Sequence, residues 1–549
     1  MTSDTRSHGV PFLGPLHETL ARATSWKALF FAALLGAFAG LAFAPFHFTL
    51  ALAVALIGLV WMIDGARGQQ RWGRAIFARG WAFGFGHFLI SMHWTAAPFL
   101  VEPEKHAIFL WMPLILLPGG MALIWGAAMS MAGAFWSASP SRIFIFTLFF
   151  AMAEWVRGNL FGGFPWNLAG TSWVPGGAIS QAASLGGTYW LTVITLFACA
   201  AGAALVDTRE ARSLAMRFMP LLVAIGCLAG QWAWGTQRLS HPSRETDVDI
   251  VLMDVGVPQA EKYVDGRPNP AVFRRYLEFL RDIPARPRDI VIWPEGATGG
   301  YLLGAQQIEP VAAYLGDRTL IAGTVRYTAG SQGEAWYNSL AVLTADSART
   351  GAAGVYDKHR LVPVGELPLS RILPFGEQLA GILPGALQRM ATAGFEPGSG
   401  PALVFGDTVP PFVAMICYEG LYPNIVTDAE HTGGERAEWI VVVSNDAWFG
   451  AWIGPAQHYA QNRYRAIESG LPMARVAARG ASAVVDGMGR EILQTKGLLE
   501  DIPGWRGQVG RTRLPESLAP PLYQTRAGKV LFPLTLVLLS VLGLFAWKR

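Results

Sequence analysis

Charged side chains are scarce in this 549-residue chain: Asp, Glu, Lys and Arg make up only 15% of it, while 52% is apolar. Soluble globular domains carry about a quarter charged residues, so the composition argues against a cytosolic globular protein and against a disordered one. The net charge is only +4. Because no strongly basic field is present, we expect no nucleic-acid partner.

Cysteine is also rare: Cys199, Cys227 and Cys417 lie far apart, and none belongs to a C-x-x-C pair. This spacing excludes zinc fingers, thioredoxin-type motifs and a disulfide framework, and it allows at most one disulfide. Cys199 and Cys227 lie in apolar runs, where a cysteine is usually a small packed hydrophobic residue. His87 and His93 do not have a ligand spacing on one helical face. We therefore expect no metal and no cofactor, and only Cys417 needs a chemical explanation.

Long apolar runs, in contrast, are abundant. Eight stretches are candidates for membrane-spanning helices, which need about 20 predominantly apolar residues. They are residues 28–46, 49–63, 80–100, 107–135, 143–156, 178–206, 216–234 and 530–547. The first has no obvious cleavage site and is followed by further spans, so it predicts a retained helix and not a signal peptide. We expect a polytopic α-helical membrane domain of about eight transmembrane helices, with seven in residues 1–240 and one in residues 521–549.

Basic residues mark one side of these predicted spans. They follow the second, fourth and sixth spans and close the chain: Arg67, Arg71, Arg74, Arg79, Arg142, Arg209, Arg212, Arg217, Lys548 and Arg549. With eight spans all these places share one side of the membrane, and Lys and Arg favour the cytoplasmic side. The pattern predicts cytoplasmic termini and places residues 236–529 on the outer face.

Two features of the apolar half have structural interpretations. The glycine-containing run 83–86 precedes no strand–helix–strand unit, so it is not a nucleotide-binding fingerprint and predicts close helix packing. Glu154 and Arg157 are three residues apart at the edge of a span, a spacing that favours an ion pair on one helical face. Ionisable residues at membrane depth are also candidates for function, and here we favour the structural interpretation.

Residues 241–520 have a different texture. Five short β-branched runs suit strands that are buried on both faces. These runs are 249–253, 289–293, 319–323, 412–416 and 439–444. Amphipathic stretches at 271–281 and 457–469 lie between them, as in α/β units. The pattern predicts a layered α/β domain outside the membrane.

Residues able to do chemistry follow the ends of these predicted strands. Glu295 comes after the run 289–293 and Cys417 after the run 412–416, while Lys358 lies in a polar loop between them. Open α/β sheets place their sites at the carboxyl ends of strands. A thiol needs a base to become a nucleophile, and a fixed cation stabilises the oxyanion that its attack creates. Glu295, Lys358 and Cys417 can fill these roles, although a cysteine at a strand end is by itself more often a buried structural thiol.

The motifs around these three residues resemble the Glu-Lys-Cys signatures of the nitrilase superfamily, and above all its membrane-bound branch, bacterial apolipoprotein N-acyltransferase. The resemblance covers nearly the whole chain, and its motifs occur in the family's order. They are Leu41 to Phe46, Ala153 to Gly158, Gly163 to Trp166, Trp293 to Glu295, Tyr337 to Ser339, Lys358, Val362 to Glu366, Cys417 to Glu419, Ser444 to Gly450, Gly454 to His458 and Arg465 to Gly470.

The resemblance implies an αββα sandwich with a defined site. Glu295 would be the general base, Cys417 the nucleophile that carries a thioester, and Lys358 the oxyanion group, together with the N–H of the residue after Cys417. Supporting and substrate-binding roles would fall to Glu366, Tyr418, Glu419 and Tyr263.

The resemblance also implies the substrates. A phospholipid would donate its sn-1 acyl chain, and the α-amine of a diacylglyceryl-cysteine at the N-terminus of an apolipoprotein would accept it in a ping-pong reaction. The catalytic domain would then face the periplasm from the bacterial inner membrane. We expect a monomer.

Three stretches depart from the family's pattern. The run 253–256 replaces a Gln-Gly-Asn type sequence, Tyr263 replaces a Trp, and 477–480 replaces an Asn-rich run. These departures leave open a paralogue with a specialised acceptor. Two further alternatives are a membrane-anchored amidase that resolves the thioester with water and a non-enzymatic scaffold that retains the fold.

Overall fold

A computed structural model describes residues 13–206, 214–264, 267–298, 305–330, 333–372, 375–381, 394–406, 408–495 and 507–547. The chain divides into two compact units. The helical unit comprises Met1–Gly158, Pro165–Ser240 and Thr525–Arg549, and the sheet unit comprises Asn159–Phe164 and His241–Gln524.

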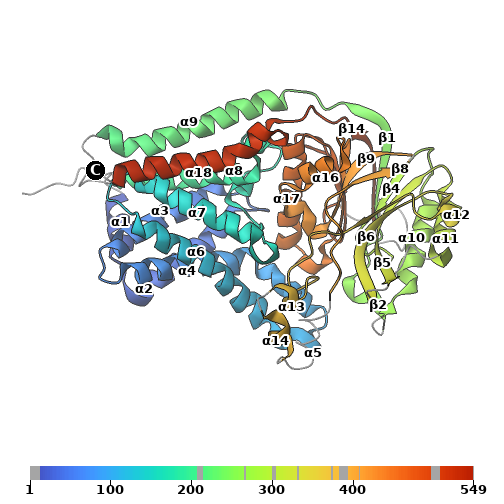
Figure 1. Ribbon diagram of the computed structural model, residues 1–549, viewed down its shortest axis with the longest axis horizontal. Coiled ribbons are helices and arrows are strands. Elements are labelled where there is room, and N and C mark those ends of the chain that lie inside the picture. Colours follow the sequence, from blue (N-terminus) through green and yellow to red (C-terminus); the bar gives the residue numbers. More distant parts are fainter. Residues whose placement is uncertain are drawn as a thin grey trace, which may run out of the picture. The chain divides into compact units, whose positions relative to one another are not determined.

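The helical unit is built from helices (Figure 1). Its α-helices are α1 (Leu13–Arg22), α2 (Ser25–Ala39), α3 (Thr49–Arg67), α4 (Trp72–Ser91), α5 (Pro103–His106), α6 (Leu117–Ala134), α7 (Arg142–Asn159), α8 (Ala183–Ala200), α9 (Leu214–Leu239) and α18 (Arg526–Trp547). Shorter helical segments are η1 (Gly40–Ala42), η2 (His93–Leu100), η3 (Ala107–Phe109), η4 (Met112–Leu116), η6 (Ala169–Ser172), η7 (Ile179–Ala182) and η8 (Ala201–Val206). Helix α8 packs against both α9 and α18.

Seven helices among the described residues are long and apolar enough to cross a membrane. They are Ser25–Ala42, Thr49–Arg67, Pro103–Ala134, Arg142–Gly162, Ile179–Val206, Ala215–Leu239 and Arg526–Leu544. The chain is therefore a membrane protein. The predicted span 80–100 is the exception: it falls on α4 and η2, and α4 is not among the seven. Helix α4 carries the polar residues Arg79 and His87, so its sequence is less apolar than those of the seven. Both side chains are buried in the bundle.

Helix α4 is held by close packing and by backbone acceptors. A Cβ atom at Gly86 would lie 2.0 Å from the carbonyl oxygen of Ala33 in α2, so only glycine lets these two helices approach. The close packing predicted for the run 83–86 is thus confirmed. The guanidinium of Arg79 donates to the carbonyl oxygens of Met62 at 2.7 Å and Ala23 at 2.6 Å, which satisfies its buried charge.

Two further predictions concern single side chains of the helical unit. Glu154 and Arg157 form a buried ion pair with 2.7 Å between Oε2 and Nη2, which confirms the structural interpretation. Cys199 is buried in α8, as predicted, but Cys227 is exposed on α9. A membrane helix can leave apolar residues at its surface because lipid tails cover them as well as protein does.

The sheet unit contains two six-stranded sheets, with strand orders β14-β1-β4-β5-β6-β7 and β13-β12-β11-β10-β9-β8. The strands are β1 (Glu245–Asp254), β2 (Tyr263–Val264), β3 (Arg267–Pro268), β4 (Ile290–Trp293), β5 (Thr319–Gly330), β6 (Gly333–Leu343), β7 (Gly354–Asp357), β8 (Leu403–Gly406), β9 (Val409–Ile416), β10 (Trp439–Asn445), β11 (Met473–Ala478), β12 (Ala483–Val485), β13 (Glu491–Gln494) and β14 (Gln508–Pro515). All five predicted β runs lie on these strands. The central pairs β1–β4, β4–β5, β9–β10 and β10–β11 are parallel, as buried α/β strands usually are.

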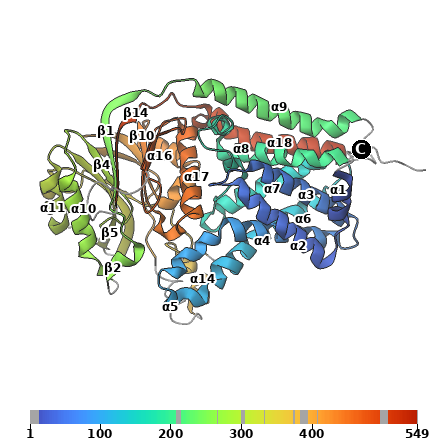
Figure 2. The same cartoon turned by 180° about the vertical axis from the view of Figure 1, so that it is seen from behind.

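Helices α10 (Pro270–Asp282) and α11 (Ala305–Leu315) pack on the first sheet, and α16 (Ile425–Gly433) and α17 (Ile453–Ser469) pack on the second. The unit also contains α12 (Ser347–Thr350), α13 (Leu369–Ile372), α14 (Gly376–Gly381), η5 (Leu160–Gly162), η9 (Gln259–Glu261), η10 (Cys417–Leu421), η11 (Asp446–Phe449) and η12 (Leu522–Gln524). Both views place α10 and α11 on one side of the sheets and α16 and α17 on the other (Figures 1 and 2). Strand β5 contacts β10, and β6 contacts β9, across the sandwich. The predicted αββα architecture is confirmed.

Sequence periodicity accounts for the outer layers. In α10, Asn269 caps the first turn through its side chain and Pro270 occupies the first helical position. Val272, Tyr276 and Phe279 then recur on one face and enter the core beneath the first sheet. The second core lies between α16, α17 and strands β9 to β11.

Candidate active site

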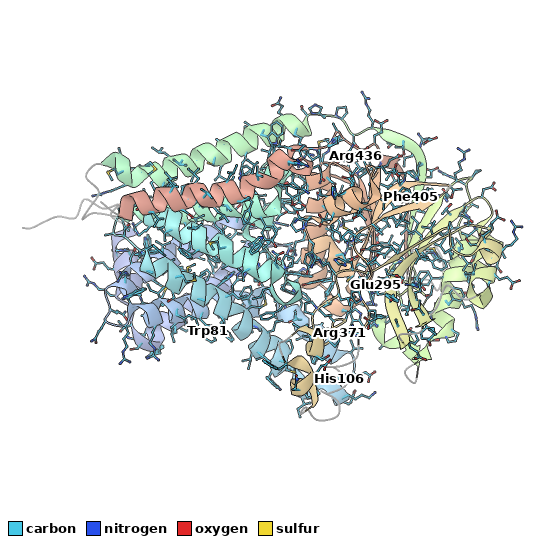
Figure 3. The ribbon with its side chains drawn as sticks, viewed as in Figure 1. Trp81, His106, Glu295, Arg371, Phe405 and Arg436 are labelled. Carbon is cyan, nitrogen blue, oxygen red and sulfur yellow. The ribbon has the colours of Figure 1, made fainter. Side chains whose placement is uncertain are left out.

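Glu295 lies directly beyond the end of β4, inside the sheet unit (Figure 3). Pro294 ends the strand, and Glu295 is only 8% exposed. The side-chain amide of Asn338 donates to Glu295 Oε1 at 2.6 Å, and the backbone N–H of Asn445 donates to Oε2 at 2.8 Å. A Cβ atom at Gly323 would lie 2.6 Å from the Glu295 Cα, so the neighbouring strand must carry glycine there. Both carboxylate oxygens are thus oriented by these two donors.

Lys358 follows β7, and its side chain is completely buried. Its Nζ lies 2.7 Å from Glu366 Oε2 and 3.6 Å from Glu295 Oε1. Burial alone lowers the pKa of Lys358, but the charges of Glu366, Glu295 and Cys417 outweigh it, so the pKa is raised. Lys358 is therefore a permanent ammonium at this position.

Cys417 stands where β9 ends and η10 begins, and it is 4% exposed. Its φ of +53° is in the left-handed region, which is uncommon for a residue with a side chain and recurs at functional sites. Burial raises the pKa of the Cys417 thiol, the charge of Glu295 raises it further, and that of Lys358 opposes both. Because the pKa ends well above its ordinary value, the resting group is a thiol that needs a base.

Glu366 belongs to the same cluster as Lys358 and Glu295. Asn338 donates to Glu366 Oε1 at 2.9 Å as well as to Glu295, and the backbone N–H of Val362 donates to Glu366 Oε2 at 2.9 Å. The two carboxylates therefore share one ammonium and one amide group, which keeps Lys358 between them.

Glu419 ties the loop of Lys358 to the strand of Cys417. Its Oε1 accepts from the Tyr356 hydroxyl at 2.7 Å and from the backbone N–H groups of His359 and Arg360, and its Oε2 accepts from the Ile416 N–H at 2.8 Å. Burial raises the pKa of Glu419, and these hydrogen bonds oppose the rise. A fully buried carboxylate with four donors fixes the distance between two segments of the site.

The remaining two predicted residues differ in what the structure shows. Tyr418 is buried, and its hydroxyl donates to the carbonyl oxygen of Gly163 at 2.6 Å, within the sheet unit. The backbone of Tyr263 forms β2, but its side chain lies outside the described part of the structure.

Sequence reasoning assigned no role to a second buried network behind Cys417. Asp446 accepts from the Ser444 hydroxyl at 2.7 Å and lies 3.0 Å from His458 Nδ1, while Arg475 Nη2 lies 2.8 Å from Asp446 Oδ2. Burial raises the pKa of Asp446, but the charges of Arg475 and His458 lower it more, so the carboxyl stays ionised. The only sequence signal was the family motif at 444–450 and 454–458.

Two of the stretches that depart from the family's pattern contact each other. The backbone N–H of Arg479 donates to Asp254 Oδ2 at 3.1 Å. Lys262, beside them in the same region, is buried, and burial lowers its pKa against the charges of Asp254 and Glu295. The stretches 253–256 and 477–480, which we predicted to depart from the family's pattern, thus meet in one patch.

The sandwich, with an acid, a lysine and a cysteine at its strand ends, defines a carbon-nitrogen hydrolase domain. Residues 268–500 match the family described as carbon-nitrogen hydrolase, and residues 35–201 match the one described as apolipoprotein N-acyltransferase N-terminal domain. The chain belongs to the apolipoprotein N-acyltransferase family.

Relatives support this membership along most of the chain. The apolipoprotein N-acyltransferase of Caulobacter vibrioides is 36% identical, with 89% of this chain and 92% of that protein covered. The protein of the same name from Rhodopseudomonas palustris is 32% identical, with 92% of this chain and 93% of that protein covered. The one from Brucella melitensis is 33% identical, with 85% of this chain and 87% of that protein covered. Among solved structures, an amidase from Nesterenkonia sp. is 16% identical with a TM-score of 0.30, covering 52% of this chain and 95% of the amidase.

Proposed function

We propose that this chain transfers an acyl chain from a phospholipid, through a thioester on Cys417, to the N-terminal α-amine of a diacylglyceryl-cysteine apolipoprotein. The observation that carries the proposal is the cluster in which a fixed ammonium, Lys358, lies between two oriented carboxylates and acts electrostatically on a buried cysteine thiol. The relatives are named for apolipoprotein N-acylation, which supports the acceptor, and the phospholipid donor is what the resemblance to that family implies.

The first half-reaction forms the thioester. Glu295 takes the proton from the Cys417 thiol, and the sulfur attacks the ester carbonyl of the phospholipid. Lys358 and the backbone N–H of Tyr418 stabilise the oxyanion. The intermediate collapses when the ester C–O bond breaks, and Glu295 returns its proton to the departing lysophospholipid alkoxide.

The second half-reaction forms the amide. The acceptor amine attacks the thioester carbonyl, Glu295 takes a proton from the nitrogen, and the carbon–sulfur bond breaks. Glu295 then returns the proton to the Cys417 sulfur, which restores the resting thiol. Both substrates are lipids, so we place the catalytic domain at the periplasmic face of the bacterial inner membrane. A single copy of the chain supplies all the proposed groups, and we propose a monomer.

The test separates the two half-reactions. Purified protein in phospholipid vesicles that carry an isotope-labelled sn-1 chain should gain one acyl mass on Cys417 by intact and peptide mass spectrometry. Addition of a synthetic diacylglyceryl peptide should move that label onto the peptide amine.

Two variants and one product check the assignment. Cys417→Ala should lose acylation completely, whereas Cys199→Ala should acylate at the parental rate. Transfer by Cys417→Ala would refute the thioester. Release of free fatty acid without transfer to the peptide would identify an amidase-type hydrolase, and absence of any acyl mass on Cys417 would favour a non-enzymatic scaffold.

A further inference from the structure

The backbone on both sides of Cys417 is held by side chains from elsewhere in the sheet unit. On the amino side, the Ile416 N–H donates to Glu419. On the carboxyl side, His458 Nε2 lies 3.1 Å from the carbonyl oxygen of Cys417. A carbonyl oxygen only accepts hydrogen bonds, so Nε2 carries the hydrogen and His458 is the donor.

The ring of His458 is itself fixed. Its Nδ1 lies 3.0 Å from Asp446 Oδ1 and 3.1 Å from Arg475 Nη2, and all three side chains are buried. Arg475 also donates to Asn462 Oδ1 at 2.9 Å, which anchors the network to α17. A Cβ atom at Gly480 would lie 2.3 Å from Asp446 Oδ2, so the chain leaves room for this carboxylate.

We propose that His458 is a positioning residue for the oxyanion site. The peptide that joins Cys417 to Tyr418 is planar, and in the trans form its C=O and N–H point in opposite directions. By holding the carbonyl oxygen, His458 fixes the direction of the Tyr418 N–H, which the proposed function assigns to the oxyanion. The inference rests on that function.

The left-handed backbone at Cys417 explains why such a holder is needed. Left-handed φ values are unfavourable for a residue with a side chain, so the turn persists only where its surroundings impose it. His458 supplies the constraint at the carbonyl that this turn presents. The arrangement differs from a Cys-His-Asp triad, because the ring nitrogen that faces Cys417 bonds its carbonyl oxygen.

Two substitutions separate the ends of the ring. An asparagine amide stands at about the position of Nδ1 and a glutamine amide at about the position of Nε2. His458→Asn therefore loses the donor to the Cys417 carbonyl, whereas His458→Gln keeps one. Arg463→Gln is the control, since Arg463 lies on the same helix but contacts Gly489 and Glu491.

The assay measures thioester formation from labelled phospholipid vesicles and, separately, alkylation of Cys417 by iodoacetamide, which creates no oxyanion. His458→Asn should lower kcat for thioester formation about 10- to 100-fold with KM unchanged, because misplaced groups lose this much. Its alkylation rate should stay within about twofold of the parental rate. His458→Gln should recover most of kcat, and Arg463→Gln should equal the parental protein.

Each contrary outcome is distinct. A parental kcat in His458→Asn would overturn the proposal, as would an equal loss of alkylation and acylation, which would place His458 on the thiol. If His458→Asn does not fold, His458→Gln decides: a kcat within about tenfold of parental supports the proposal, and a larger loss with parental alkylation and thermal stability overturns it. Failure of the parental protein itself to form the thioester would refute the proposed function, and this assignment would fall with it, whereas failure of the assignment alone leaves the parental rate intact.

Discussion

Lys358 and Glu366 form an ion pair in which the lysine side chain is completely buried, with Nζ 2.7 Å from Oε2. A buried ammonium is costly unless it is paired and hydrogen-bonded. Here Glu366 supplies the countercharge at close range, while Glu295 Oε1 stands farther away at 3.6 Å. Glu295 therefore remains available for proton transfer although it shares the field of the same cation.

Replacement of Glu295 tests the general base. Glu295→Gln keeps the shape of the side chain but cannot accept the thiol proton, so thioester formation should fall by about 10² to 10⁴. Mass spectrometry of Cys417 after incubation with labelled phospholipid measures the rate, and thermal unfolding checks the fold. Acylation at the parental rate by the folded variant would assign the base elsewhere.

Replacement of Lys358 tests the oxyanion group. Lys358→Ala should lower the rate of thioester formation by about 10² to 10³ and leave phospholipid binding nearly unchanged, because the charge it stabilises develops only during the reaction. Lys358→Arg should recover little, since the planar guanidinium cannot take the position of a compact ammonium. Single-turnover acylation and vesicle binding separate the two effects. Weak binding with a normal chemical rate would contradict the assignment.

Replacement of Glu419 tests its structural role. Glu419→Gln places an amide N–H where Oε2 now accepts from Ile416, so a donor faces a buried donor. We expect the free energy of unfolding to fall by about 2 to 3 kcal/mol. Glu396→Gln is the control, because Glu396 pairs with Arg371 at the exposed surface and should change stability by less than about 0.5 kcal/mol. Equal unfolding midpoints for the two variants would refute the role.

The raised pKa of the Cys417 thiol predicts a pH dependence of stability. Below the ordinary thiol pKa of about 8.5 the group is protonated in both the folded and the unfolded state. As the pH rises above that value, the unfolded state releases the proton and the folded state retains it, so stability is lost by up to about 1.4 kcal/mol per pH unit. The free energy of unfolding of the parental protein should therefore fall more steeply above pH 8.5 than that of Cys417→Ser. Parallel curves would show that the folded-state pKa is not raised.

Fusions test the proposed orientation. A reporter fused at Thr432, on the exposed end of α16, should be active only in the periplasm, and one fused after Arg549 only in the cytoplasm. Each position is fused, through the same linker, to two reporter enzymes, one active only in the periplasm and one active only in the cytoplasm. The ratio of the two activities gives the side of the membrane. A cytoplasmic signal at Thr432 would overturn the orientation and the lipid substrates with it.

The sequence by itself determined what depends on local pattern. Apolar length marks a membrane helix, because each such helix must satisfy its own backbone in lipid. Short β-branched runs and the amphipathic stretches between them predicted a layered α/β domain. The ends of two of these runs predicted Glu295 and Cys417, because α/β sheets place their sites at the carboxyl ends of strands.

The tertiary structure decided what depends on which elements meet. Arg79 of α4 finds its acceptors, the carbonyl oxygens of Met62 and Ala23, only in the folded bundle. Asn338 reaches Glu295 across 43 residues of sequence because β6 pairs with β5, and His458 reaches the Cys417 carbonyl because α17 packs behind η10. A sequence pattern reports the periodicity of one helix or strand and does not say which other elements that helix or strand packs against. These contacts therefore follow only from sheet order and helix packing.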